Sequence, residues 1–147
     1  MKRLGLVVAV LGLAACGGSH AGSGRLTTAQ YEARVNRLCL VSADRFRELH
    51  LTITVGDYRH YGSSIVHIDE AFVRKLARWK PPAGMAAAAA AFAKAYEKAA
   101  RDDRNAVAAA RAGDATKLQA AVKQANTDEL KTFVAARAIG ATGCYIP

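Results

Sequence analysis

The chain has 147 residues, a length that suits one domain able to bury a sizeable core. It carries 21 Lys and Arg against 12 Asp and Glu, so its formal charge is +9 at pH 7 and we expect attraction to anionic surfaces. The basic residues are scattered and mixed with acidic ones, which excludes a polybasic tail of the kind that binds nucleic acid. Abundant alanine and few clusters of β-branched residues favour helices over sheets.

The N-terminus has the pattern of an export signal. Residues 1–3 provide a positive charge, and the apolar run over 4–13 is too short for a retained transmembrane helix. Two alanines and Cys16 follow Leu13. This ending resembles the bacterial lipoprotein signal, in which the cysteine thiol is diacylated and the cysteine becomes the first mature residue. The resemblance implies that residues 1–15 are removed and that Cys16 carries a lipid on the extracytoplasmic face of the cell membrane.

Removal of the signal lowers the formal charge to about +7, because only Lys2 and Arg3 are lost. Anionic lipid headgroups or wall polymers are therefore expected partners of the mature protein, whereas nucleic acid is not. Each well-placed basic residue near a membrane contributes roughly 1 kcal/mol. Residues 16–26 are rich in Gly and Ser, so we expect a flexible tether that leads to one domain over 27–147.

The first helix begins at a capping box formed by Thr27 and Gln30 and ends near His50. Residues 51–55 favour an extended connection, and Gly56 with Asp57 predicts a turn in which Asp57 caps the next helix.

The second helix is predicted over 58–79, where large apolar residues recur at helical spacing along one stripe and Glu70 pairs with Arg74 on the outside. Pro81 and Pro82 end it. The stripe comprises Tyr58, Tyr61, Ile65, Ile68, Phe72, Leu76 and Trp79.

The third helix is predicted over 83–112, with small residues that permit close helix packing. Gly113 and Asp114 separate it from a fourth helix that extends to about Ile139, before Gly140. Similar lengths and short connections predict an all-α, antiparallel up-down-up-down four-helix bundle. A three-helix core crossed obliquely by the first helix is the alternative.

Three cysteines are present. If Cys16 carries lipid, Cys39 and Cys144 remain in an oxidising compartment, and we expect a disulfide between them with Cα atoms about 4.4 to 6.8 Å apart. A redox-active pair is the alternative, but the spacing is not Cys-x-x-Cys.

Catalytic and metal motifs are weak in this sequence. The four histidines, His20, His50, His60 and His67, match no metal-ligand spacing, and we expect them at the surface. Ser63 and Ser64 near two of these histidines lack a nucleophile elbow. The adjacent acids Asp69–Glu70 and Asp102–Asp103 diverge by about 100° on a helix, so we expect them to be solvated rather than to share a proton. We therefore predict no catalytic residues, no metal site and no enzymatic activity.

Six aromatic residues favour core packing, with a ligand cavity between helices as the alternative. They are Tyr58, Tyr61, Phe72, Trp79, Phe92 and Tyr96.

The mature chain resembles a group of uncharacterised secreted or lipid-anchored helical proteins of actinobacteria. The resemblance depends on Tyr31, Asn36, Cys39, the segment 76–83 with its two prolines, Gly140 and Cys144. It implies a helical fold and the pairing of the two cysteines, and it implies no activity.

Two functions agree with these observations. The first is a non-enzymatic, lipid-anchored binding or structural module of the bacterial cell envelope. The second is a carrier of haem or another apolar small molecule in the bundle core, since a single axial side chain can hold haem in an apolar pocket.

The lipid anchor is testable by substitution. We expect Cys16→Ser to leave an unlipidated precursor that retains residues 1–15, because the acyl acceptor is gone. Detergent partitioning and the mass of the N-terminal peptide measure this, and Cys144→Ser serves as a control that keeps lipidation. A mature, unmodified wild-type chain that begins elsewhere would contradict the anchor.

Overall fold

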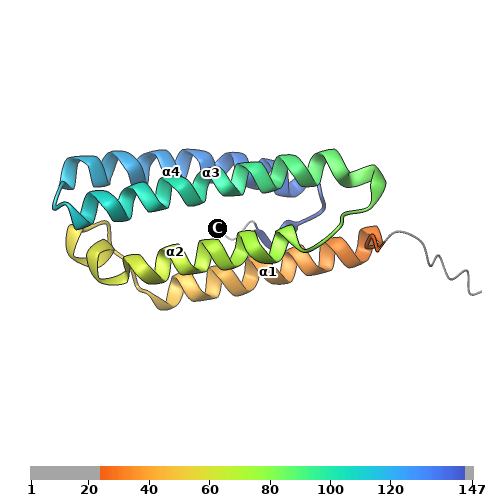
Figure 1. Cartoon of the computed structure of the whole chain (residues 1–147), viewed down its shortest axis with the longest axis horizontal. Coiled ribbons are helices and arrows are strands. Elements are labelled where there is room, and N and C mark those ends of the chain that lie inside the picture. The colour runs from red at the N-terminus through yellow and green to blue at the C-terminus, as the bar shows by residue number, and fades with distance from the viewer. Residues whose placement is uncertain (1–23, 145–147) are drawn as a thin grey trace, which may run out of the picture.

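The computed structural model describes residues 24–144, which form four α-helices and, within that range, no strands (Figure 1). The described part of the chain is thus all-α, as predicted. The predicted signal peptide, Cys16 and the tether up to residue 23 lie outside the described residues. The elements are α1 (Thr28–Glu48), α2 (Val55–Ala77), the single turn η1 (Ala83–Met85), α3 (Ala86–Arg111), α4 (Ala115–Arg137) and the single turn η2 (Thr142–Cys144).

The start of α1 follows from its capping residues. The hydroxyl of Thr27 accepts a hydrogen bond from the backbone N–H of Gln30 at 3.2 Å, and the Gln30 side chain accepts from the Thr27 N–H at 3.0 Å. The predicted capping box is therefore confirmed. Just before it, the Leu26 N–H donates to the carbonyl of Lys80, so the end of the predicted tether lies against the linker between α2 and α3.

The start of α2 differs from the prediction. The helix begins at Val55, and the Thr54 hydroxyl accepts from the Asp57 N–H at 3.1 Å, so Thr54 rather than Asp57 is the N-cap. The Asp57 carboxylate instead accepts from the backbone N–H of Thr52 at 3.0 Å. Threonine caps helices nearly as well as aspartate, and starting three residues earlier lets both side chains accept backbone hydrogen bonds.

The other helix ends follow the predicted signals closely. Helix α2 ends at Ala77, before the two prolines, and Gly113 has φ +76 between α3 and α4. The Asp114 carboxylate caps α4 by accepting from the Lys117 N–H at 2.9 Å. These positions agree with the general preference for Gly after a helix and Asp before one.

The four helices form two layers, α1 with α2 and α3 with α4 (Figure 1). Helix α3 packs against both α2 and α4, whereas α1 packs on α2 and on η2. Two apolar clusters fill the interior. The first contains Tyr31, Val35, Leu38, Cys39, Phe72, Leu76, Ala89, Phe92, Ala136, Ile139 and Ala141. The second contains Tyr58, Ile65, Ala106, Val107, Ala109, Ala110, Leu118 and Val122.

Small residues bring α2 and α3 close together. A Cβ on Gly62 would lie 2.6 Å from a methyl group of Val107, a separation that atoms do not tolerate. Several alanines of α3 are fully buried, as the predicted close packing requires. Among the described helices, none is long and apolar enough to cross a membrane.

A disulfide joins Cys39 in α1 to Cys144 in η2, with the Cα atoms 4.8 Å apart. This confirms the predicted pairing. Asn36, one turn earlier on α1, supports it. Its side-chain oxygen accepts from the Gly143 N–H at 2.6 Å, and its amide donates to the Gly140 carbonyl at 3.4 Å. The C-terminal turn is therefore held against α1 by one covalent bond and two hydrogen bonds.

Removal of the disulfide provides a test of its contribution to stability. We expect Cys39→Ser and Cys144→Ser each to lower the free energy of unfolding by roughly 2 to 5 kcal/mol, because the unfolded chain regains the entropy of a long loop. The double variant should be no less stable than the worse single variant. Denaturant unfolding measures all three, and additive losses would contradict a shared bond.

Candidate functional site: a cavity between the helices

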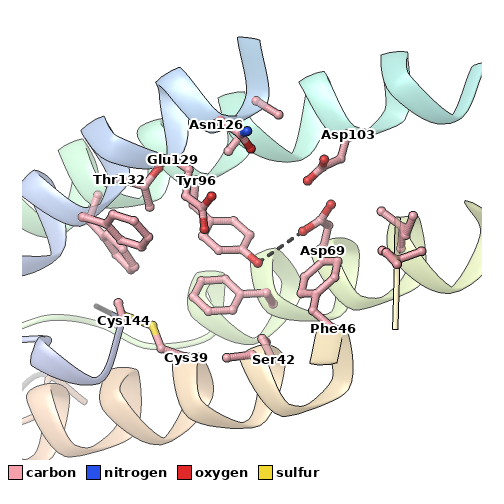
Figure 2. Close-up of a pocket in the computed structure, with 18 of the residues that line it drawn as sticks. Cys39, Ser42, Phe46, Asp69, Tyr96, Asp103, Asn126, Glu129, Thr132 and Cys144 are labelled. Carbon is pink, nitrogen blue, oxygen red and sulfur yellow. Dashed lines mark hydrogen bonds between the residues drawn. A yellow bond between two sulfur atoms is a disulfide. The ribbon is translucent and has the colours of Figure 1, made fainter. Parts of the chain in front are cut away.

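A cavity of about 290 Å³ lies between the helices, and all four helices contribute to its wall (Figure 2). We call it the interhelical cavity. Its wall draws on both apolar clusters, so it lies where the core is interrupted. The lining residues are Cys39, Ser42, Ala43, Phe46, Leu51, Tyr58, Ile65, Asp69, Phe72, Phe92, Tyr96, Ala99, Asp103, Ala125, Asn126, Glu129, Thr132, Phe133, Gly143 and Cys144.

Aromatic side chains form much of the apolar wall. The rings of Phe72 and Tyr96 are stacked, with centroids 3.7 Å apart and an angle of 5° between their planes. Phe92 packs edge-on against both rings. Stacked and edge-on pairs add stability beyond area burial, so this wall is a rigid surface.

Three carboxyl groups from three helices also line the cavity: Asp69 of α2, Asp103 of α3 and Glu129 of α4. Asp69 is only 2 % exposed. The Tyr96 hydroxyl donates to its Oδ1 at 3.3 Å, the bond drawn in Figure 2, where Asp103 faces Asp69 from the opposite helix. Its Oδ2 is buried and has no hydrogen-bond partner among residues 24–144.

Burial and mutual repulsion keep these acids from ionising normally. Burial, followed by the negative charge of Asp103, raises the pKa of Asp69 to about 8. Burial and the charge of Glu129 raise the pKa of Asp103 to about 6. Two facing carboxylates are both acceptors, so a proton held between them removes the repulsion and supplies the donor that Oδ2 lacks. Near neutral pH the pair of Asp69 and Asp103 therefore holds one proton.

This arrangement corrects the prediction that the adjacent acids are solvated. Each pair is divided between two environments. Asp69 points into the cavity, whereas Glu70 pairs with Arg74 outside at 3.2 Å, as predicted. Asp103 lines the cavity, whereas Asp102 is also buried but lies outside the cavity, where it pairs with Lys98 at 3.4 Å.

The sequence contains a signal that could have located Asp69. This residue follows Ile65 by four positions and precedes Phe72 by three, so it lies within the apolar stripe of α2. A carboxyl at a core position of an amphipathic helix indicates a buried polar site. Asp103 and Glu129 lack such a signal, because their inward orientation depends on how α3 and α4 pack.

A second buried acid, Asp128 of α4, has a different environment. It is 1 % exposed, and its carboxylate accepts from Lys131 at 2.7 Å, from Gln124 at 2.6 Å and from Lys98. Hydrogen bonds from the Lys131 ammonium, the Lys98 ammonium and the Gln124 amide, in that order of effect, hold the pKa of Asp128 well below its usual range. These contacts satisfy the carboxylate fully, so Asp128 joins α3 to α4 as a structural group.

The histidines stay away from the cavity. His50, His60 and His67 are exposed, as predicted, and His20 lies outside the described residues. Within residues 24–144, no group of three or more His, Cys, Asp or Glu is arranged to hold a metal ion. The hydroxyl-bearing residues Ser63 and Ser64 are also exposed and do not line the cavity.

The six aromatic residues were predicted either to pack in the core or to line a cavity between the helices, and the structure divides them between these two positions. Tyr58, Phe72, Phe92 and Tyr96 line the cavity, and Phe72 and Phe92 also belong to the first apolar cluster. Trp79 and Tyr61 do not line this cavity and pack against the apolar clusters.

No protein-family model, curated protein or solved structure matches this chain. The geometry and chemistry of the interhelical cavity therefore carry the functional proposal.

The carboxyl pair makes a prediction about stability. The folded chain keeps a proton on Asp69 that the unfolded chain loses above about pH 4. The native state thus binds more protons than the unfolded state between about pH 4 and pH 8, so its stability falls as pH rises through this range. We expect Asp69→Asn to flatten this fall and to raise the free energy of unfolding near pH 8 by about 1 to 3 kcal/mol.

Asp128→Asn is the matched control, because it changes an equally buried aspartate that has three donors. It should lower stability at neutral pH, the opposite sign. Thermal unfolding followed by circular dichroism across the pH range measures both variants. A loss of stability in Asp69→Asn at pH 8 would contradict the assigned environment of Asp69.

Proposed function

We propose that this protein is a lipid-anchored, extracytoplasmic binding protein of the bacterial cell envelope that holds a small organic molecule in the interhelical cavity without catalysing a reaction. The supporting observation is the cavity itself, lined by four helices and interrupting the core at a buried carboxyl oxygen that lacks a partner. A chain with no ligand to hold gains stability by filling such a space with apolar side chains. Binding sites in helical bundles commonly lie in this position.

The volume favours a small ligand. About 290 Å³ is near the lower end of the range for small-molecule pockets, and about 150 Å³ is enough for a benzene molecule. A single ring with a short side chain suits this space better than haem. The lining also has no histidine or methionine among residues 24–144, and its two cysteines are joined in the disulfide. Of the usual axial ligands of haem, only tyrosine remains in this wall.

The anchor and the bundle order belong to the same proposal. A lipid on Cys16 would hold the cavity close to the membrane, since Leu26 already contacts the linker between α2 and α3. The basic charge would favour orientation toward anionic lipid or wall polymer. Short connections between successive helices support the antiparallel up-down-up-down order.

Access of small molecules to the cavity is the decisive test. We expect 2-phenylethanol or 2-phenylethylamine, added to the full chain in detergent micelles, to shift the methyl resonances of the lining residues Ala43 and Ala125 in NMR spectra. The substitution Ala99→Phe, at a residue that also lines the cavity, should abolish both shifts because the added ring occupies the space.

Ala91→Phe is the matched control, because Ala91 is an exposed residue of the same helix and does not line the cavity. It should leave the shifts as in the wild type. If neither compound perturbs Ala43 and Ala125 in the wild type, the cavity is only a hydrated gap in the core and the proposed binding function is wrong.

A further inference from the structure

The three carboxyl groups of the interhelical cavity define the chemistry of its ligand. We propose that the cavity selects a monocationic organic amine, an inference that rests on the proposed binding function. The ammonium group would lie among Asp69, Asp103 and Glu129, and the apolar part of the ligand would lie against the aromatic wall. The three carboxyl groups come from three different helices and line one cavity. A single group bound in that cavity could therefore contact all three.

The charges around the cavity favour a cation. Helix α3 places Tyr96, Asp103 and Arg104 near Asp69, and α4 contributes Glu129. Arg104 is exposed and does not line the cavity. Helix α2 adds the uncharged phenol of Tyr58 to the wall.

The lining residues of α1 are uncharged: Cys39, Ser42, Ala43 and Phe46. The space therefore carries a net negative charge near neutral pH, even while Asp69 and Asp103 share a proton. An anionic ligand would add a like charge beside the buried Asp69, which is unfavourable.

Hydrogen bonding leads to the same class of ligand. Within the described part of the chain, Asp69 Oδ2 has no donor except the proton that it shares with Asp103, and once that proton is lost Asp69, Asp103 and Glu129 are all acceptors. An ammonium group brings up to three donors and no acceptor, so it complements three carboxyl groups. A neutral alcohol brings one donor. The nearby lysine of α3, Lys98, cannot play this part from within the chain, because it pairs with Asp102 and Asp128.

The bound ammonium and the shared proton compete for the same place. An amine would displace the proton between Asp69 and Asp103, so its affinity should rise with pH as the pair ionises, while the amine itself keeps its charge. A neutral ligand would show no such rise. The pH profile thus distinguishes a charge-specific site from simple apolar burial.

The experiment compares three probes of similar size: 2-phenylethylamine, 2-phenylethanol and phenylacetate. NMR titration of the full chain at about pH 8 should give the amine an affinity about tenfold above that of the alcohol, and phenylacetate the weakest. Lowering the pH to about 5 should weaken only the amine, by about tenfold. Asp69→Asn combined with Asp103→Asn should reduce the preference for the amine over the alcohol from about tenfold to about threefold, because Glu129 remains in the wall.

Glu70→Gln is the matched control, because it removes one exposed negative charge next to Asp69 in α2 but outside the cavity. It should leave the preference for the amine unchanged. Should the double variant fail to fold, Glu129→Gln on the more exposed wall tests the same point and should weaken the amine alone by about threefold.

Each outcome decides one claim. Equal binding of amine and alcohol by the wild type, or tighter binding of phenylacetate, would overturn the amine preference and leave the binding function standing. Failure of all three probes to bind would overturn both. A preference for the amine that is undiminished in the double variant and in Glu129→Gln would show that the carboxyl groups do not create it.

Discussion

The attachment of the C-terminal turn to α1 is the constraint on which this structure depends. Helix α1 packs on α2 and on η2, and η2 is held by the Cys39–Cys144 disulfide and by Asn36. Three residues at this attachment also line the interhelical cavity: Cys39, Gly143 and Cys144. A covalent bond at this point closes the cavity wall without requiring side chains to fill the space, so the fold can keep a hollow in its core.

Away from the disulfide, the helices are held by noncovalent contacts: α3 contacts α2 and α4 through apolar side chains and buried alanines.

Two buried aspartates show how the same residue type has different roles in different surroundings, stabilising the fold at one position and lining the proposed binding site at another. Asp128 has three donors and stays ionised, so its burial joins two helices. Asp69 has one donor, the Tyr96 hydroxyl, and faces a second acid. Its burial is unfavourable in its ionised form, and a protein retains such a group most readily where a ligand supplies the missing charge and donors. The contrast between these residues, more than the volume of the cavity, supports a ligand with a positive charge.

Much of the local structure was predictable because it depends on short-range signals. The capping box of Thr27, the prolines at 81 and 82, and the cap at Asp114 each act within one helical turn, and each marks a boundary within a few residues. The disulfide was predictable from the cysteine count once Cys16 was assigned to lipid. The predicted start of α2 was wrong. Thr54 and Asp57 are both good N-cap residues, and the sequence alone does not decide which of the two side chains accepts the hydrogen bond from the first turn of the helix.

The sequence by itself determined an all-helical chain, four helices with their approximate ends, and the pair of cysteines that would be joined. Only the tertiary structure decided which of two adjacent acids lines the cavity and which acids meet. The members of each pair diverge by about 100° around their helix, so the rotation of α2 and α3 against their neighbours directs Asp69 rather than Glu70, and Asp103 rather than Asp102, into the cavity. Their approach, and the pKa shifts that come with it, arise from contacts between residues 34 positions apart in the chain. Local propensity carries no information about such contacts, since it acts within a helix and not between helices.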